Sequence, residues 1–269
     1  MRILTLTVMT LSMTLGGGAP ALAQSADERA AARDILTRQG EAVVTVLGTL
    51  KARMSQAGRD RPAPDQAVQA SATMLDQTGL TVLALSTIDP GNLMGKNPAF
   101  EAAKITLETE LTDVKLRLAD GSEVAGKVVL RDSDLDLLFV RPATPPEKPT
   151  PSVDNTSPTF NAVDPVVVVH RMQEVAGWKA AAGFGTIEVV VEKPRRFYMM
   201  TTAGGTNGLG GAVFNVKGQF GGIVALRQSS DSRHNALNGM QGGLLQTLGM
   251  VPVVVPASDI RDIAKQAAK

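Results

Sequence analysis

Short apolar runs separated by turn residues recur along the chain from Glu41 onward. The runs are rich in Val, Leu, Ile and Ala, a composition typical of half-buried or fully buried β-strands. They lie at Glu41–Leu50, Ala70–Leu75, Leu80–Ser86 and Ile105–Leu118, and they continue through the second half of the chain to Pro256. The intervening "DQTG" at 76–79 and "DG" at 120–121 have hairpin-turn chemistry. This pattern predicts an all-β fold, with the strands closed into barrels or packed as a sandwich.

Helical patterns are confined to the two ends of this region. Residues 24–40 are rich in Ala, Glu and Arg, and Ser25 precedes Glu28 with capping-box spacing. The stretch "ASDIRDIAKQAAK" after Pro256 is capped and amphipathic. We therefore predict a short N-terminal helix and a C-terminal helix. The polar segment 51–66 is predicted to be a surface loop, and so is the Gly-, Ser-, Asn- and Met-rich segment 229–250.

A proline-rich segment divides the strand-forming region into two halves. Pro142 to Pro158 contains six prolines and no apolar run, which is typical of a linker or of a long surface crossing. The boundaries predicted from this are a first β-unit at 41–141, a linker at 142–160, and a second β-unit with the C-terminal helix at 161–269. The two halves show no obvious sequence repeat.

The first 23 residues have the pattern of a secretory signal peptide. Arg2 precedes an apolar run, and Ala21-Leu22-Ala23 supplies a small-residue cleavage site. A membrane anchor is the alternative, but the glycines at 16–18 interrupt the run. We expect a periplasmic or secreted bacterial protein with no stable membrane span after cleavage.

The net charge and the lack of cysteine limit the kinds of ligand and partner that the chain is expected to bind. Of 27 basic and 26 acidic residues, only Arg2 lies in residues 1–23, so 26 of each sign remain after cleavage and the net charge is zero. A neutral chain without a basic cluster does not favour nucleic-acid binding. The chain has no Cys, which excludes a disulfide and a thiolate metal site.

A glycine cluster, "TTAGGTNGLGGAVFN" at 201–215, lies between two predicted strands. It is preceded by "VKLRLADGSEVAGKVVLRDSDLDLLFVRP" at 114–142 and "FNAVDPVVVVHRM" at 160–172, and it is followed by "VPASDI" at 255–260. The order of these stretches resembles trypsin-like serine proteases of the HtrA/Deg family. The resemblance runs from about Glu41 to Lys265, without a PDZ-length segment after it. It implies two six-stranded β-barrels.

The same resemblance places the three positions of a catalytic triad, and two of them lack the required side chain. Asp136 matches the family's aspartate, but Ser86 stands in place of the histidine and Leu209 in place of the nucleophilic serine. Leucine cannot attack a carbonyl, and serine cannot act as a general base near neutral pH. The glycines permit a tight, amide-exposing loop, so Asn207, Gly208, Gly210 and Gly211 are interpreted as a remnant of the oxyanion loop.

We therefore expect a non-catalytic homologue, a pseudoprotease. In this family a substrate pairs as an added strand beside the nucleophile loop, and the resemblance places that edge at Ala225, Leu226, Arg227 and Gln228. Binding of this kind needs no triad, so a peptide or an envelope protein is the expected partner. Leu209 would then either offer an apolar contact or simply plug the old cleft.

Two alternatives stay open at this point. One is an active serine endopeptidase with an atypical site, and the other is a different β-rich envelope protein. His170 is expected to have a structural role and His234 to be a solvated loop residue. No cofactor motif is present, because "GGTNGLGG" is followed by neither Gly-Lys-Ser/Thr nor a helix. The carboxylates of "DSDLD" at 132–136 lack the glycine and glutamate of a calcium loop, so we expect no metal there. The oligomeric state is left open.

Overall fold

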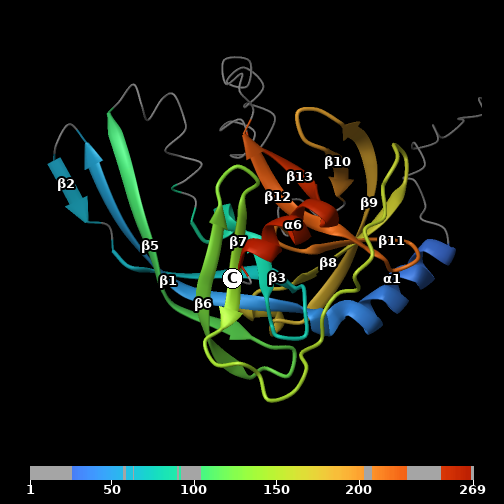
Figure 1. Cartoon of the computed structure of the whole chain (residues 1–269), viewed down its shortest axis with the longest axis horizontal. Coiled ribbons are helices and arrows are strands. Elements are labelled where there is room, and N and C mark those ends of the chain that lie inside the picture. The colour runs from blue at the N-terminus through green and yellow to red at the C-terminus, as the bar shows by residue number, and fades with distance from the viewer. Residues whose placement is uncertain are drawn as a thin grey trace, which may run out of the picture.

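The protein consists of two antiparallel β-barrels with a helix at each end (Figure 1). The computed structural model describes residues 26–56, 59–62, 64–89, 91, 104–202, 208–228 and 250–267. Helix α1 (Ala26–Gln39) continues into a 3₁₀ turn, η1 (Gly40–Ala42), and helix α6 (Ala257–Ala267) ends the described chain. The predicted fold class and both terminal helices are confirmed. No helix within the described residues is long and apolar enough to span a membrane.

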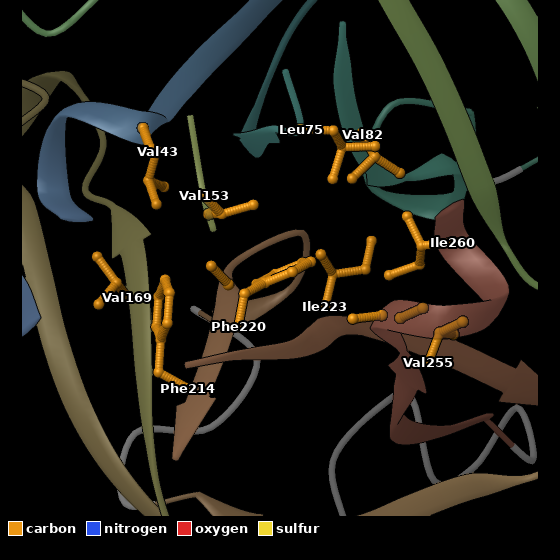
Figure 2. Close-up of a cluster of buried hydrophobic side chains, with 14 of the residues drawn as sticks. Val43, Leu75, Val82, Val153, Val169, Phe214, Phe220, Ile223, Val255 and Ile260 are labelled. Carbon is orange, nitrogen blue, oxygen red and sulfur yellow. The ribbon is translucent and has the colours of Figure 1, made fainter. Parts of the chain in front are cut away.

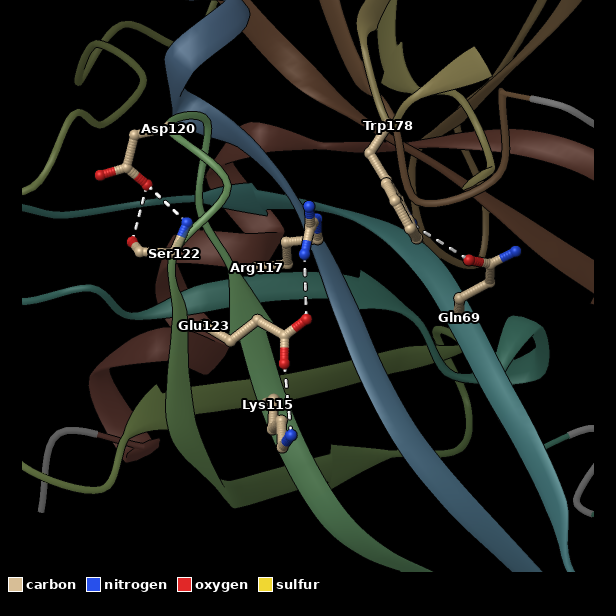
Figure 3. Close-up of polar contacts among 7 residues, drawn as sticks. All are labelled: Gln69, Lys115, Arg117, Asp120, Ser122, Glu123 and Trp178. Atoms are coloured by element: carbon tan, nitrogen blue, oxygen red, sulfur yellow. Dashed lines mark hydrogen bonds and ion pairs between the residues drawn. The ribbon is translucent and has the colours of Figure 1, made fainter. Parts of the chain in front are cut away.

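Six strands of the first half close into a barrel. In order around it they are β1 (Val43–Gln56), β3 (Gln66–Met74), β4 (Thr81–Ala84), β7 (Leu137–Pro142), β6 (Glu123–Asp132) and β5 (Ile105–Arg117). Pairing of β5 back onto β1 closes the ring. The short β2 (Arg59–Pro62) pairs only with the far end of β1. The predicted D-G turn joins β5 to β6, with Gly121 at φ +88° and Asp120 bonded to Ser122 (Figure 3).

The second half forms a closed barrel of its own. Its order is β10 (Phe197–Thr202), β13 (Met250–Pro256), β12 (Phe220–Gln228), β11 (Ala212–Asn215), β8 (Pro165–Arg171) and β9 (Ala180–Val191). Two six-stranded antiparallel barrels are consistent with a trypsin-like double-barrel fold, the architecture expected from the resemblance.

Three large buried clusters make most of the core of the described chain. One contains only first-barrel residues such as Val46 and Leu138, and another mostly second-barrel strand residues such as Tyr198 and Val224. The third lies between the barrels, where Val43 and Val82 from the first barrel meet Phe214 and Ile223 from the second (Figure 2). Because this interface is apolar and fully buried, the two barrels pack as one body.

Both helices pack on this interface. Ile35 of α1 has no exposed surface, and α1 lies against β8 and β9 of the second barrel. Ile260 of α6 is equally buried and lies at the end of the inter-barrel cluster (Figure 2). The N-terminal helix thus completes the chain's own core.

The proline-rich crossing is held at several points along the protein. Within 143–164 there is no helix or strand, as predicted. Yet Thr150 N–H donates to Gln77 O (3.0 Å) and Val153 N–H to Met74 O (3.0 Å). The Val153 side chain is buried in the inter-barrel cluster and Phe160 is buried in the second barrel. Of the two alternatives, a linker or a long surface crossing, the segment is the crossing, and it is anchored to both barrels.

The prediction of a surface loop at 51–66 was wrong. Strand β1 runs through Gln56, β2 occupies 59–62, and β3 begins at Gln66. In the β1–β5 register Lys51 faces Glu110 and Arg53 faces Glu108, cross-strand pairs of opposite charge that stabilise an exposed ribbon. Figure 1 shows this ribbon extending from the barrel at the left. A strand exposed on both faces has no apolar alternation, and so its sequence pattern indicates a loop.

Candidate functional site

Asp136 lies at the junction of the two barrels, in the tight turn between β6 and β7. Its backbone is left-handed (φ +58°), a conformation that Asp tolerates better than most residues. The side chain is only 1% exposed. Its Oδ1 accepts the Ser86 backbone N–H at 2.7 Å, while Oδ2 accepts the Ser86 hydroxyl at 2.7 Å and the Leu226 N–H at 2.8 Å. One carboxylate thus connects both barrels.

Burial dominates the electrostatics of this carboxylate. Removal from water raises the pKa of Asp136 to about 6, while the hydrogen bonds from Leu226 and Ser86 act in the opposite direction. All three donors are neutral, and no ion pair to Asp136 occurs in the part of the chain that the structure describes. The group therefore changes charge within the mildly acidic range.

Ser86 follows β4 in the short 3₁₀ turn η2 (Leu85–Thr87). Its hydroxyl donates to Asp136, so this hydrogen bond occupies the proton that a nucleophile would have to release. In a catalytic triad the residue bonded to the aspartate is an imidazole, which accepts the nucleophile's proton on its other nitrogen. A hydroxyl has no such second basic atom. Ser86 and Asp136 are therefore hydrogen-bonded to each other, at the positions that the resemblance matches to the family's histidine and aspartate.

Leu209 lies on the loop that precedes β11 and faces the same junction. Its half-buried side chain packs against Leu226 and Met250 and joins the edge of the second barrel's core. Because the Leu226 amide is bonded to Asp136, Leu226 connects Leu209 to the Asp136–Ser86 pair. The three positions expected from the resemblance are therefore gathered at one place.

The glycines of this loop attach it to both barrels. Gly210 has φ +76°, donates its N–H to Val224 O (2.8 Å) and accepts the Thr73 hydroxyl (3.4 Å). Gly211 N–H donates to Gly208 O (2.9 Å), and Val224 N–H to Gly211 O (3.1 Å). The amides of Gly210 and Gly211 thus bond within the protein. Asn207 lies outside the described residues, and an oxyanion role for the loop stays a prediction.

The predicted peptide-binding edge corresponds to the end of β12. On one side Ala225–Gln228 pair with Val253–Met250 of β13. On the other side β11 ends at the Ala212–Ile223 pair, and no described strand takes its place beyond Val224. Ala225 and Leu226 are buried, and the Arg227 guanidinium lies 4.6 Å from the centre of the Phe197 ring. The backbone of Gln228 is the part of this edge farthest from the junction.

A cavity of about 440 Å³ opens beside Leu209, between the barrels. Its walls come from β1 and β3 on one side and from the end of β8 and the turn after it on the other. The lining residues are Thr45, Gln69, Ala70, Ser71, Thr87, His170, Arg171, Met172, Gln173, Val175 and Leu209. Apart from Leu209 and His170, the sequence reasoning had singled out none of them. The available signal was weak: a polar Thr45 within an apolar strand, and His170-Arg171 directly after four valines.

His170 does not rebuild a triad in this cavity. Burial lowers the pKa of the imidazole, which favours the neutral ring at neutral pH. Its Nδ1 is buried and has no hydrogen-bond partner, so no carboxylate orients the ring. His234 lies outside the described residues.

In the neighbouring stretch "DSDLD", the Asp132 carboxylate stabilises the turn between β6 and β7. Asp132 Oδ1 accepts the N–H groups of Asp134 and Leu135, each at 3.0 Å, a common arrangement in tight turns. Within the described ranges, no group of three or more His, Cys, Asp or Glu residues is placed to hold a metal ion.

Comparison with known proteins adds no family assignment. A scan against protein-family models finds no match for this chain. No curated protein matches it in sequence. The double-barrel architecture therefore rests on the structure, and the family resemblance rests on the order of the motifs alone.

Proposed function

We propose that this chain is a non-catalytic, HtrA/Deg-like serine protease homologue that binds extended polypeptide. The observation that carries the proposal is the set of hydrogen bonds around the Asp136 carboxylate. Its carboxylate is bonded to a serine and a backbone amide, with Leu209 beside them. An aspartate in this setting has no imidazole to orient, and the leucine has no atom that could attack a carbonyl. Loss of both groups removes nucleophilic catalysis.

Binding along β12 is the function that such a site retains. An extended segment can pair with a free strand edge through main-chain hydrogen bonds, without any catalytic group. On the side of β12 away from β13, the N–H of Val224 is bonded to Gly211 and the N–H of Leu226 to Asp136, so the proposal rests on the backbone of Gln228, where no described strand pairs on that side. Leu209, Leu226 and Met250 form an apolar cluster next to it. We further propose a periplasmic or secreted location, with a peptide or an envelope protein as partner.

Reaction with a fluorophosphonate probe tests the absence of catalysis. This probe labels serines that a base has activated, whatever the substrate. We expect no labelling of the chain from Gln24 onward by intact-mass spectrometry, under conditions in which trypsin is labelled completely. Neither Ser86, bonded to a buried carboxylate, nor Ser71 has an oriented imidazole to activate it.

Ser86→Ala and Ser71→Ala variants serve as site controls. Stoichiometric labelling of one serine, lost in one of these variants, would establish the atypical serine endopeptidase instead.

A further inference from the structure

Arg227 lies at the end of β12, on the outer face of the second barrel. Side chains alternate along a strand, and Val224 points into the core of this barrel, whereas Ile223 and Ala225 belong to the cluster between the barrels. Arg227 shares the face of Ile223 and Ala225 and is the first residue of that face to reach the surface, where it is half-buried. It is also the neighbour of Gln228, whose backbone has no described strand beside it on the side away from β13.

The Arg227 guanidinium is held in place without being neutralised. Its central carbon lies 4.6 Å from the centre of the Phe197 ring, and a guanidinium stacked on an aromatic ring keeps its N–H groups available at its edge. Within the described residues, the guanidinium makes no hydrogen bond and no ion pair. Arg227 is therefore a fixed cation with unused donors.

Further positive charge lies on the turn between β9 and β10. Arg196 lines the same shallow recess as Arg227, and Lys193 and Arg195 are exposed on this turn without an ion-pair partner among the described residues. Acidic residues do not cancel these charges. Glu192 pairs with Arg196 at 2.8 Å, and Asp134 lines the recess without forming an ion pair to either arginine within the described chain.

The position of Arg227 matters for a polypeptide that pairs with Gln228. In an antiparallel pair, hydrogen-bonded positions alternate with non-hydrogen-bonded positions, and side chains lie closest at the latter. If the Gln228 backbone is bonded to the added strand, Arg227 is at a non-hydrogen-bonded position. An Asp or Glu side chain directly opposite it is then within reach of the guanidinium, and opposite charges at such a position stabilise the pairing.

We propose that the polypeptide bound at the end of β12 is acidic and places an Asp or Glu opposite Arg227. The unpaired Lys193 and Arg195 add a longer-range attraction for the same kind of segment. This inference rests on the proposed binding along β12, and it specifies the partner of that site.

Two labelled peptides test the inference. The first is fluorescein-GSTVEVEVTSG, in which two glutamates share one face of an extended strand, and the second has glutamine at both positions. We expect the glutamate peptide to bind about threefold or more tightly by fluorescence anisotropy in low salt, as a partly exposed ion pair implies. This preference should shrink in about 0.5 M NaCl, because salt screens exposed charges.

Arg227→Gln should abolish the preference, so that both peptides bind this variant equally. Arg33→Gln is the matched control, because Arg33 is exposed on α1, has no ion-pair partner among the described residues and lies outside the recess. It removes the same charge from the protein, and it should keep the preference for the glutamate peptide.

Equal binding of the two peptides to the unmodified protein would overturn the inference and leave strand pairing at β12 intact. A preference that survives in Arg227→Gln, or that is lost equally in Arg33→Gln, would also overturn it, because net charge alone would then explain the selectivity. Binding of neither peptide would contradict the proposed function and this inference together.

Discussion

Gly210→Ala is expected to destabilise the protein by more than about 4 kcal/mol, a magnitude seen only for severe lesions. A Cβ at residue 210 would lie 2.1 Å from Ser71 O and 3.1 Å from its carbonyl carbon. Both are backbone atoms of the neighbouring barrel, so no side chain can rotate to make room. Urea unfolding followed by circular dichroism measures the effect, and the variant should lose most of its stability if the starting value lies near the lower end of the usual range of about 5–15 kcal/mol.

Gly177→Ala is the matched control for this prediction. Gly177 has φ +63°, close to that of Gly210, but no atom lies within 4 Å of its would-be Cβ. It should therefore lose only the left-handed backbone preference, about 1–2 kcal/mol. If the two variants lost similar stability, the loop carrying Leu209 would not be fixed against the first barrel.

Ser86→Ala should destabilise the protein in a pH-dependent way. Its hydroxyl stabilises the ionised form of Asp136, and hydrogen bonds to charged groups contribute about 1.5–3 kcal/mol. We expect a loss of about 2 kcal/mol in the free energy of unfolding at pH 8. The loss should be less than half as large at pH 5, where the folded-state carboxyl is mostly protonated. Urea titrations at the two pH values measure both.

Proton linkage gives the direction in which stability changes with pH. The pKa of Asp136 is about 6 when folded and 3.8 in the reference state, so between these values the folded protein binds more protons than the unfolded one. Stability from this group is full below pH 4 and is lost as the pH rises through 6, a change of about 3 kcal/mol. Removing a donor to the anion raises the folded-state pKa further and extends this loss to higher pH.

Ser122→Ala is the control for Ser86→Ala. Ser122 also donates its hydroxyl to an aspartate, Asp120, but both residues are exposed (Figure 3). Loss of an exposed pair of this kind should leave the free energy of unfolding nearly unchanged and show no step near pH 6. A pH-independent loss in Ser86→Ala would contradict a raised pKa at Asp136.

Local signals in the sequence predicted most of the fold. The predicted turns at 76–79 and 120–121 both occur, and Gly79 and Gly121 adopt the positive φ that such turns need. Strands buried on one or both faces, such as Pro165–Arg171, are recognisable as apolar runs. These elements depend on short-range chemistry, which one sequence records.

The missed features depend on contacts between distant residues. The polar end of β1 is a strand because Lys51 and Arg53 meet Glu110 and Glu108 across the ribbon. The anchoring of the crossing at Val153 depends on Met74, far away in the chain. Local propensity carries no information about such partners.

In the candidate site, too, some residues could be predicted from the sequence and others could not. Ser86, Asp136 and Leu209 were found through a resemblance in motif order, and the structure brings them together. The cavity was not predicted, because Thr45, Ser71 and His170 come from three separate strands and form no motif. Its lining became visible only once the chain was folded.

Polypeptide binding at the end of β12 is the decisive property of the proposed function. The N–H groups of Val224 and Leu226 point away from β13, and the alternation of a strand gives Gln228 the same direction. Gln228→Pro removes this N–H, whereas Gln228→Ala keeps it. The measurement is the affinity of fluorescently labelled β-casein, an extended polypeptide, for the two variants by anisotropy.

We expect β-casein to bind Gln228→Ala as tightly as the unmodified protein, and to bind Gln228→Pro more weakly by about tenfold or more. Equal affinities of the two variants, or no binding of β-casein to the unmodified protein, would contradict it.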